Sequence, residues 1–209
     1  ADWLQALHTY DKDGDYGVIA PLIEASSQLA AAHLRQAAFY EKTNNIGQAR
    51  SALRKFREIC ATATTDPLVN LFVPELLKRT AWVDNNSLSD RQYELAWNHL
   101  EHGDYLRAAT LGFEAVVTRL VEAAPGMLDP HLYETRETVK KGWEAEMKVP
   151  RKDRTAMQQA YLDLREIRNV LAHGSRSHFG PIQQALSAEE KLKATLTKAL
   201  TLAHIGAKR

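Results

Sequence analysis

Hydrophobic residues recur three and four positions apart along almost the whole of this 209-residue chain. This spacing puts apolar side chains on one face of an α-helix, and no convincing stretch shows the strict alternation of a half-buried strand. The pattern predicts an all-α protein, built as an antiparallel helical bundle with short connections. The predicted helices span residues 2–10, 18–40, 45–62, 90–101, 104–124, 131–147, 152–173 and 182–205.

The best candidate for a strand is the apolar stretch 68–73, which Pro67 and Pro74 bracket. No other stretch offers it a partner strand, and proline is poorly tolerated inside a sheet. We therefore interpret it as a short helix or a buried connector.

Two segments, 40–50 and 99–109, resemble each other because each joins a glycine turn to an alanine-rich helix, as tetratricopeptide hairpins do. Their glycines, Gly47 and Gly103, lie 56 residues apart, which is not the 34-residue period of such repeats. We interpret the likeness as ordinary helix-hairpin chemistry.

The clearest break in the helical pattern is the polar run 84–89, which is rich in turn-forming residues. Ser89 is placed to cap a helix that begins at Asp90. We therefore predict an additional N-terminal helical region over residues 1–88, followed by a helical bundle over residues 89–209.

Composition is that of an ordinary globular protein, with 44% hydrophobic and 25% charged residues. No apolar run approaches the roughly 20 residues that a membrane span needs, and no secretory leader is visible, so we expect a cytoplasmic protein without a membrane partner. Because the chain begins at Ala1 within a predicted helix, we expect it to be a piece of a longer protein. The single cysteine, Cys60, lies on an apolar helix face and predicts a buried thiol in a reducing compartment. Four-ligand Cys/His metal sites are excluded by count, and we predict neither a metal nor a cofactor.

Charge is unevenly distributed although the formal net charge is only +1. Residues 147–209 hold twelve Lys/Arg and five Asp/Glu, whereas the preceding residues hold fifteen Lys/Arg and twenty-one Asp/Glu. A basic third of this kind favours a polyanion partner, and a solvated basic face is an equally open alternative.

The most informative segment, residues 165–174, closes the predicted helix 152–173 inside this basic third. On a helical wheel, Arg168 falls within the apolar face formed by Ala160, Tyr161, Leu164, Ile167 and Leu171. A guanidinium there is costly unless it is paired or lines a wet cavity. Arg165, Asn169 and His173 form a stripe on the flank of that face.

Arg168 and His173 lie about 140° apart around an ideal helix, so one copy of the helix does not easily direct both at one atom. Either the last turn unwinds at Gly174, or helices from two protomers face each other and share their groups. The second alternative predicts a two-fold homodimer with a composite site.

These residue types suit the cleavage of RNA without a metal. Arg168 would neutralise a phosphate, and His173 would act as general base or acid. Asn169 would orient the imidazole or the attacking 2′-hydroxyl, and the product would carry a 2′,3′-cyclic phosphate. The same residues are also common as capping and ion-pairing groups near a helix end, and that alternative stays open.

The string 168–173 resembles the R-N-x-x-x-H form of the signature of HEPN domains, which are helical bundles that often act as metal-independent endoribonucleases. The flanking residues 164–167 and Gly174 suit the same pattern. Residues 100–109 resemble an early bundle helix of the HEPN proteins attached to type III CRISPR systems.

The resemblance implies a homodimeric endoribonuclease that cleaves single-stranded RNA in antiviral defence. It implies that Arg168 and His173 are the catalytic pair and that Asn169 assists them. Weaker candidates for RNA contacts are Arg165, Arg176 and His178. In that group a CARF domain senses cyclic oligoadenylate; nothing in this chain resembles one, so such control would need a sensor domain that this chain lacks.

Two alternatives remain beside this hypothesis. The first is a non-catalytic helical module, HEPN-like or tetratricopeptide-like, that serves interaction or dimerisation. The second is a HEPN partner of a nucleotidyltransferase toxin, whose acidic tract would lie on another chain.

Overall fold

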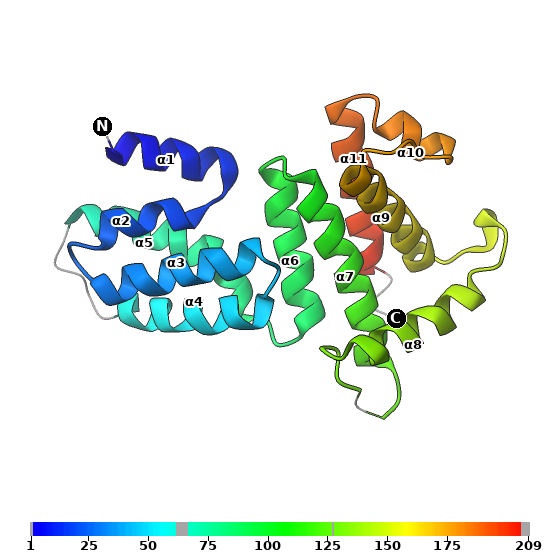
Figure 1. Cartoon of the computed structure of the whole chain (residues 1–209), viewed down its shortest axis with the longest axis horizontal. Helices are drawn as coiled ribbons and strands as arrows, with labels where there is room; N and C mark the ends of the chain where they lie inside the picture. Colours follow the sequence, from blue (N-terminus) through cyan, green and yellow to red (C-terminus); the bar gives the residue numbers. More distant parts are fainter. Residues whose placement is uncertain (1, 62–66, 127, 206–209) are drawn as a thin grey trace. The chain divides into compact units, whose positions relative to one another are not determined.

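The computed structural model of the chain describes residues 2–61, 67–126 and 128–205. Every regular element within those residues is helical, which confirms the predicted all-α class (Figure 1). The chain divides into two compact units, residues 1–85 and 86–209. The predicted N-terminal region, residues 1–88, would end at the first residue of helix α6 (Leu88–Glu101).

The N-terminal unit is organised around a hairpin of two helices, α3 (Gln28–Lys42) and α4 (Ile46–Ala61). The hairpin buries Leu34, Leu53 and Phe56 together with several alanines, which allow the two backbones to approach closely. The other elements of this unit are the helices α1 (Asp2–Asp13), α2 (Ala20–Ile23) and α5 (Pro67–Arg79) and the 3₁₀ helices η1 (Tyr16–Ile19) and η2 (Ala81–Asp84).

The single helix predicted over residues 18–40 is wrong in its first part. The chain forms η1 and the short α2, turns, and begins again as α3. The new start depends on Ser27, whose hydroxyl accepts a 3.2 Å hydrogen bond from the backbone N–H of Ala30. The stretch 68–73 is helical, one of the two predicted alternatives, but it belongs to the longer α5, which continues through Pro74.

The two hairpin turns that look alike in sequence are built differently. In the first, Asn44 takes the left-handed backbone conformation with φ of +56°, and Gly47 already lies inside α4. In the second, Gly103 is left-handed with φ of +72°, and Asp104 caps helix α7 (Tyr105–Ala123). The shared pattern therefore marks two helix hairpins and not one repeated turn.

The C-terminal unit contains α6, α7, α8 (Tyr133–Glu146), η3 (Arg151–Asp153), α9 (Ala156–His173), α10 (Gly180–Ala185) and α11 (Glu189–Ile205). Helices α6 and α7 form a hairpin, and α9 and α11 pack on α7 (Figure 1). At Gly112 of α7, an added Cβ would lie 2.5 Å from Leu200 Cδ2 and 3.2 Å from Leu164 Cδ2. Three helices therefore meet at Gly112 with no room for a larger residue.

The start of α6 corrects the predicted cap. Ser87, and not Ser89, is the capping residue, because its hydroxyl accepts a 3.0 Å hydrogen bond from the N–H of Asp90. Ser89 is buried, and its hydroxyl donates over 2.5 Å to Oε2 of Glu122, which ties the start of α6 to the end of α7. The helix predicted over residues 182–205 also divides, into α10 and α11.

Cys60 is partly exposed, and not fully buried as predicted. It stands near the end of α4, where the packed part of the hairpin gives way to more open surface. Partial burial still raises the pKa of its thiol to about 11, which makes the thiol a poor nucleophile near neutral pH.

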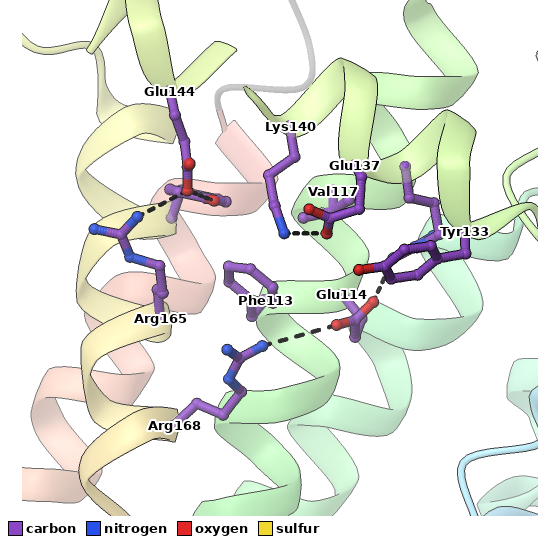
Figure 2. Close-up of a pocket in the computed structure, with 11 residues that line it drawn as sticks. Phe113, Glu114, Val117, Tyr133, Glu137, Lys140, Glu144, Arg165 and Arg168 are labelled. Atoms are coloured by element: carbon purple, nitrogen blue, oxygen red, sulfur yellow. Dashed lines mark hydrogen bonds and ion pairs between the residues drawn. The ribbon is translucent and has the colours of Figure 1, made fainter. Parts of the chain in front are cut away.

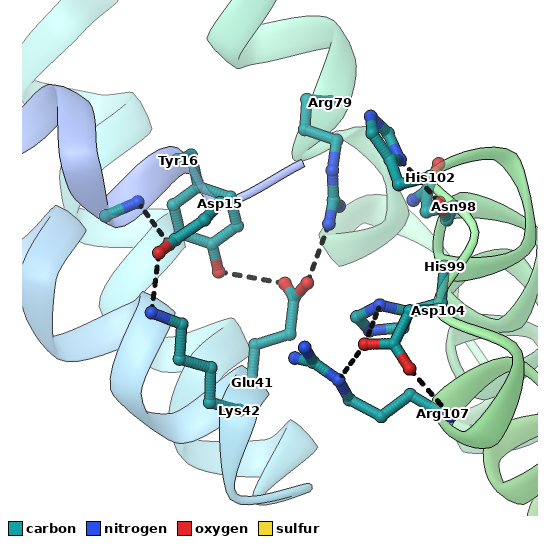
Figure 3. A network of polar contacts seen from close by, with 11 residues as sticks. Asp15, Tyr16, Glu41, Lys42, Arg79, Asn98, His99, His102, Asp104 and Arg107 are labelled. Carbon is teal, nitrogen blue, oxygen red and sulfur yellow. Dashed lines mark hydrogen bonds and ion pairs between the residues drawn. The ribbon is translucent and has the colours of Figure 1, made fainter. Parts of the chain in front are cut away.

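A buried ion pair joins α3 to α5 inside the N-terminal unit (Figure 3). Arg79 Nη2 donates to Glu41 Oε1 over 2.7 Å, and the side chains are only 7% and 5% exposed. The hydroxyl of Tyr16 donates to the other carboxylate oxygen over 2.9 Å. Burial acts to lower the pKa of Arg79, but the adjacent Glu41 carboxylate outweighs it and raises that pKa, so the guanidinium keeps its charge.

We predict that Arg79→Met lowers the free energy of unfolding of the N-terminal unit by about 3–5 kcal/mol, because it leaves the Glu41 carboxylate buried without its counter-charge. The double variant Arg79→Met/Glu41→Leu should recover most of the loss. Urea denaturation of the full chain, followed by circular dichroism, measures both changes.

Lys42→Met is the matched control. Lys42 is paired with Asp15 over 2.6 Å, but its side chain is 52% exposed, so we expect a loss below about 1 kcal/mol. Equal losses for the two single variants would contradict the assignment of a buried pair.

Candidate functional site

Helix α9 carries the motif, and its two ends are both defined by local sequence. Thr155 and Gln158 form a reciprocal cap: the Thr155 hydroxyl accepts from the Gln158 N–H over 3.2 Å, and the Gln158 side chain accepts from the Thr155 N–H over 2.9 Å. This cap explains why the helix begins at Ala156 and not at residue 152 as predicted. At the other end, Gly174 takes the left-handed conformation with φ of +61°.

Because α9 is regular as far as His173, its last turn does not unwind before Gly174 in this structure. The helix buries Ala160, Tyr161, Leu164, Ile167 and Val170. Four of these belong to the predicted apolar face; Leu171, the fifth predicted member, is only half-buried. The rotation of the helix therefore agrees closely with the helical wheel.

Arg168 follows the buried face of α9, as the wheel predicts, and its side chain is 30% exposed. The guanidinium carbon lies 4.3 Å from the centroid of the Phe113 ring, a cation–π contact. Nη1 lies 4.0 Å from Glu114 Oε1, a long ionic contact. Arg168 is therefore held against α7 with part of its guanidinium open to solvent.

This guanidinium lines a polar cavity of about 270 Å³ between α7, α8 and α9 (Figure 2). Eleven residues line the cavity: Phe113, Glu114, Val117, Tyr133, Arg136, Glu137, Lys140, Glu144, Tyr161, Arg165 and Arg168. Four of them are cations and three are carboxylates. The lining therefore carries one positive charge in excess.

Ion pairs within the lining show where the excess charge lies. Each carboxylate has a close cation: Arg136 contacts Glu114, Lys140 contacts Glu137, and Arg165 contacts Glu144 over 2.7 Å. Arg168 reaches only the already paired Glu114, at the longer distance of 4.0 Å. Among the lining residues, Arg168 is therefore the least neutralised cation.

Asn169 contacts Arg168 and not the predicted imidazole. Its Oδ1 accepts hydrogen bonds from Arg168 Nε over 3.2 Å and from Nη2 over 2.9 Å. The amide thus clamps one edge of the guanidinium and leaves Nη1 toward Glu114. Asn169 is placed to position Arg168, a role that sequence reasoning had not assigned to it.

His173 is exposed on the last turn of α9 and does not line the cavity that holds Arg168. Along a regular helix, five residues separate the two side chains by about 7.5 Å of rise and about 140° of rotation. One protomer therefore does not bring the predicted catalytic pair together.

Arg165 lies between two cavities. Its Nη1 and the hydroxyl of Tyr161 both donate to Oε1 of Glu144, which joins α9 to α8. Partial burial acts to raise the pKa of Glu144, but the hydrogen bond from Tyr161 and the charge of Arg165 outweigh it, so the pKa is lowered. Arg165 also lines a second cavity, of about 420 Å³, together with His178 and Phe179.

The loop between α9 and α10 holds Arg176 and His178 and is tied down by Ser177. The Ser177 hydroxyl donates to Glu166 Oε1 over 2.6 Å and accepts from the Phe179 N–H over 3.0 Å. His178 reaches the second cavity with Arg165, whereas Arg176 is exposed and lines neither cavity. Of the six predicted site residues, three line a cavity (Arg165, Arg168 and His178), Asn169 contacts Arg168, and His173 and Arg176 are exposed.

Sequence reasoning missed the residues of α8 that complete the first cavity. Arg136, Lys140 and Glu144 lie four residues apart, a stripe on one helix face that in sequence looks like an ordinary solvated surface. Glu114, their neighbour on α7, interrupts an otherwise apolar run. A charged stripe on one helix, together with a lone carboxylate in the apolar face of the preceding helix, is the signal that could have been used.

Two further features of the described residues bear on function. No cluster of three or more His, Cys, Asp or Glu side chains is arranged there to hold a metal ion. Within the same part of the chain, no helix is both long and apolar enough to cross a bilayer.

In comparisons with protein-family models, characterised proteins and solved structures, nothing matched this chain. The likeness to HEPN domains therefore rests on the motif residues of α9 and their helical setting. Any assignment of function has to be argued from the geometry of this site.

We predict that Glu144→Gln lowers the free energy of unfolding of the C-terminal unit by about 1 kcal/mol at pH 7. The pKa of Glu144 is lowered in the folded protein, so its carboxylate stabilises the fold above its usual pKa, and this contribution is lost as pH falls through the lowered value. The difference between the variant and the wild type should therefore become smaller as pH falls below the usual pKa of a glutamate.

Denaturant unfolding at pH 7, 5 and 3 tests this dependence. Glu146→Gln, an exposed position at the end of the same helix, is the control and should have no effect at any of these values. A difference for Glu144→Gln that persists unchanged at pH 3 would contradict the ionic role.

Proposed function

We propose that this chain is a metal-independent endoribonuclease of the HEPN type, which cleaves single-stranded RNA at a composite site between two copies of the chain. The observation that carries the proposal is the state of Arg168. It is clamped by Asn169 and stacked on Phe113, yet it is the least neutralised cation of a polar cavity. A guanidinium held in this way suits a phosphate that gains charge in a transition state.

His173 supplies the second group that the reaction needs. An imidazole can take or give a proton near neutral pH, and the side chain is exposed five residues beyond Arg168 on the same helix. In the proposed reaction the 2′-hydroxyl of the RNA attacks the adjacent phosphorus and loses its proton. The 5′-oxygen leaves with a proton, and the other product carries a 2′,3′-cyclic phosphate.

The placement of the two side chains on one regular helix supports the proposal of a homodimer. Since Arg168 and His173 point in different directions, a two-fold axis beside α9 would place His173 of one copy near Arg168 of the other. We propose that the protein works in this form in the cytoplasm, in CRISPR-linked antiviral defence. Control by cyclic oligoadenylate would require a sensor domain beyond this chain.

A non-catalytic helical module for dimerisation or partner binding is the second candidate. The observation in its favour is that Arg165 and Glu144 form an ion pair, as do Arg136 and Glu114, and these pairs have a structural role without any reaction. This candidate predicts a dimer of twice the 23.5 kDa chain mass that has no nuclease activity.

We predict that the protein cleaves single-stranded RNA in the presence of EDTA, and that His173→Ala and Arg168→Ala each lower the rate by about 100-fold or more. Asn169→Ala should cause a smaller loss, since it only frees the guanidinium from its clamp. Gel analysis of a labelled oligonucleotide measures the rate, and circular dichroism checks that the variants are folded.

His131→Ala is the matched control, because His131 is an exposed histidine before α8 that lines neither cavity, and it should keep full activity. Cleavage that requires an added divalent metal ion would overturn the proposal. The absence of cleavage by a dimeric wild type would favour the second candidate.

The composite site has a separate test by mixing inactive variants. If each site takes Arg168 from one copy and His173 from the other, an Arg168→Ala chain paired with a His173→Ala chain forms one intact site and one doubly altered site. An equimolar mixture that exchanges subunits should then recover about a quarter of the wild-type rate, since half of the dimers are mixed and each holds one of two sites. A mixture that stays inactive after exchange would contradict the composite site.

A further inference from the structure

The cavity between α7, α8 and α9 extends beyond the groups that the proposed cleavage uses. Arg168 lies at one side of it, and the rest of its lining comes from α7 and α8 (Figure 2). Neither His173 nor Asn169 belongs to this lining. Most of the lining therefore consists of residues that have no part in the proposed proton transfer.

The charge of the lining indicates what the cavity would bind. Three carboxylates are matched by three close cations, and Arg168 is left over. A lining with one excess positive charge matches one negative group. An internal phosphodiester of RNA carries one negative charge, in contrast to the nearly doubly charged terminal phosphate.

Aromatic side chains indicate what accompanies that charge. Tyr133, at the start of α8, lines the cavity although its side chain is 74% exposed. Figure 2 shows Arg168 under the Phe113 ring and the Glu114 carboxylate between Arg168 and Tyr133. Tyr133 and Arg168 thus line one cavity, an exposed aromatic ring and a cation. Proteins that bind single-stranded nucleic acid combine such groups, because a base stacks on the ring and a phosphate meets the cation.

The size and the walls of the cavity limit the ligand to one unit. Its volume of about 270 Å³ lies just below the usual range for ligand sites, which begins at about 300 Å³, and a groove for duplex RNA would be far larger. Lys140 and Glu137 lie on the α8 wall and present a donor and an acceptor that a base edge could use. No residue of α8 is buried, and this wall is attached by ion pairs to Glu114 and Arg165 and by the edge-on contact of Trp143 with Tyr161.

We infer that this cavity is a subsite for one nucleotide of single-stranded RNA, with its phosphodiester on Arg168 and its base stacked on Tyr133. The inference rests on the proposed function for the position of the RNA, because Arg168 contacts the phosphate in both. It adds α8 to the substrate-binding surface, and it makes the base next to the cleaved bond a determinant of affinity.

The test measures binding without cleavage. The probe is a fluorescein-labelled 2′-O-methyl RNA tetranucleotide, which has no free 2′-hydroxyl to attack and is therefore not cleaved. Fluorescence anisotropy of the full chain gives the dissociation constant. Tyr133→Ala should weaken binding about tenfold, and Tyr133→Trp should restore it, because a base stacks on either aromatic ring.

Leu132→Ala is the matched control. Leu132 is the neighbouring residue, 52% exposed and apolar, and it does not line the cavity, so its removal should leave affinity unchanged. Lys140→Gln should weaken binding and reduce its dependence on salt, since it removes one cation from the lining. A probe with the same backbone but without bases should bind weakly, and its affinity should be the same for the wild type and for Tyr133→Ala, because it has no base to stack on the ring.

Three results would overturn the subsite: wild-type affinity in Tyr133→Ala, an equal loss in Leu132→Ala, or equal affinity for the probe without bases. These results are independent of the nuclease assay. If RNA is cleaved in a His173-dependent way but Tyr133→Ala has no effect, the proposed function stands and the subsite is wrong. If Tyr133→Ala and Arg168→Ala lose binding but RNA is never cleaved, the subsite stands and the nuclease is wrong.

Discussion

The close approach of α7, α9 and α11 at Gly112 is the constraint on which the site depends. Leu164 of α9 and Leu200 of α11 occupy the space that a side chain at this position would need. This contact sets both the rotation and the height of α9 along α7. Arg168 follows one helical turn after Leu164, and the ring it covers, Phe113, directly follows Gly112. The position of the guanidinium is therefore a consequence of apolar packing.

Helix α8 is attached in a different way. None of its residues is buried, and it is joined to its neighbours by the ion pairs of Arg136 with Glu114 and of Glu144 with Arg165 and by the packing of Trp143 against Tyr161. Such partly exposed pairs contribute little stability and are screened by salt. The third wall of the cavity is therefore attached through contacts that stay partly open to solvent, whereas α7 and α9 share a buried apolar interface.

The regularity of α9 as far as His173 keeps Arg168 and His173 on different sides of one helix. Under the proposed function, a single chain would therefore supply only one of the two groups at each composite site. Asn169, the second residue of the motif, accepts a hydrogen bond from Arg168 and so holds the guanidinium in place. Under the proposed function, each copy contributes to two sites. Its Arg168 binds the phosphate at one site, and its His173 transfers a proton to or from a reacting oxygen at the other.

Much of the helical architecture could be predicted, because periodicity and caps are local properties. The all-α class, the helical stretch 68–73 and the apolar face of α9 with Arg168 inside it all follow from residue spacing. The errors arose where two local signals competed. Ser27 began a new helix inside a continuous apolar pattern, and Ser87 capped α6 ahead of the equally plausible Ser89.

The cavity could not be predicted, because it is made of residues that are far apart in the chain. Arg136, Lys140 and Glu144 look like an ordinary solvated helix face, and the positions of Glu114 and Arg168 in apolar faces do not show which residues they meet. That depends on which helix faces which. By itself the sequence determined the helices and the rotation of the motif on its own helix, since those depend on contacts within a few residues. Only the tertiary structure decided that Arg168 keeps an unmatched charge and that Asn169 holds it, because ion pairing depends on distances between helices that no local pattern records.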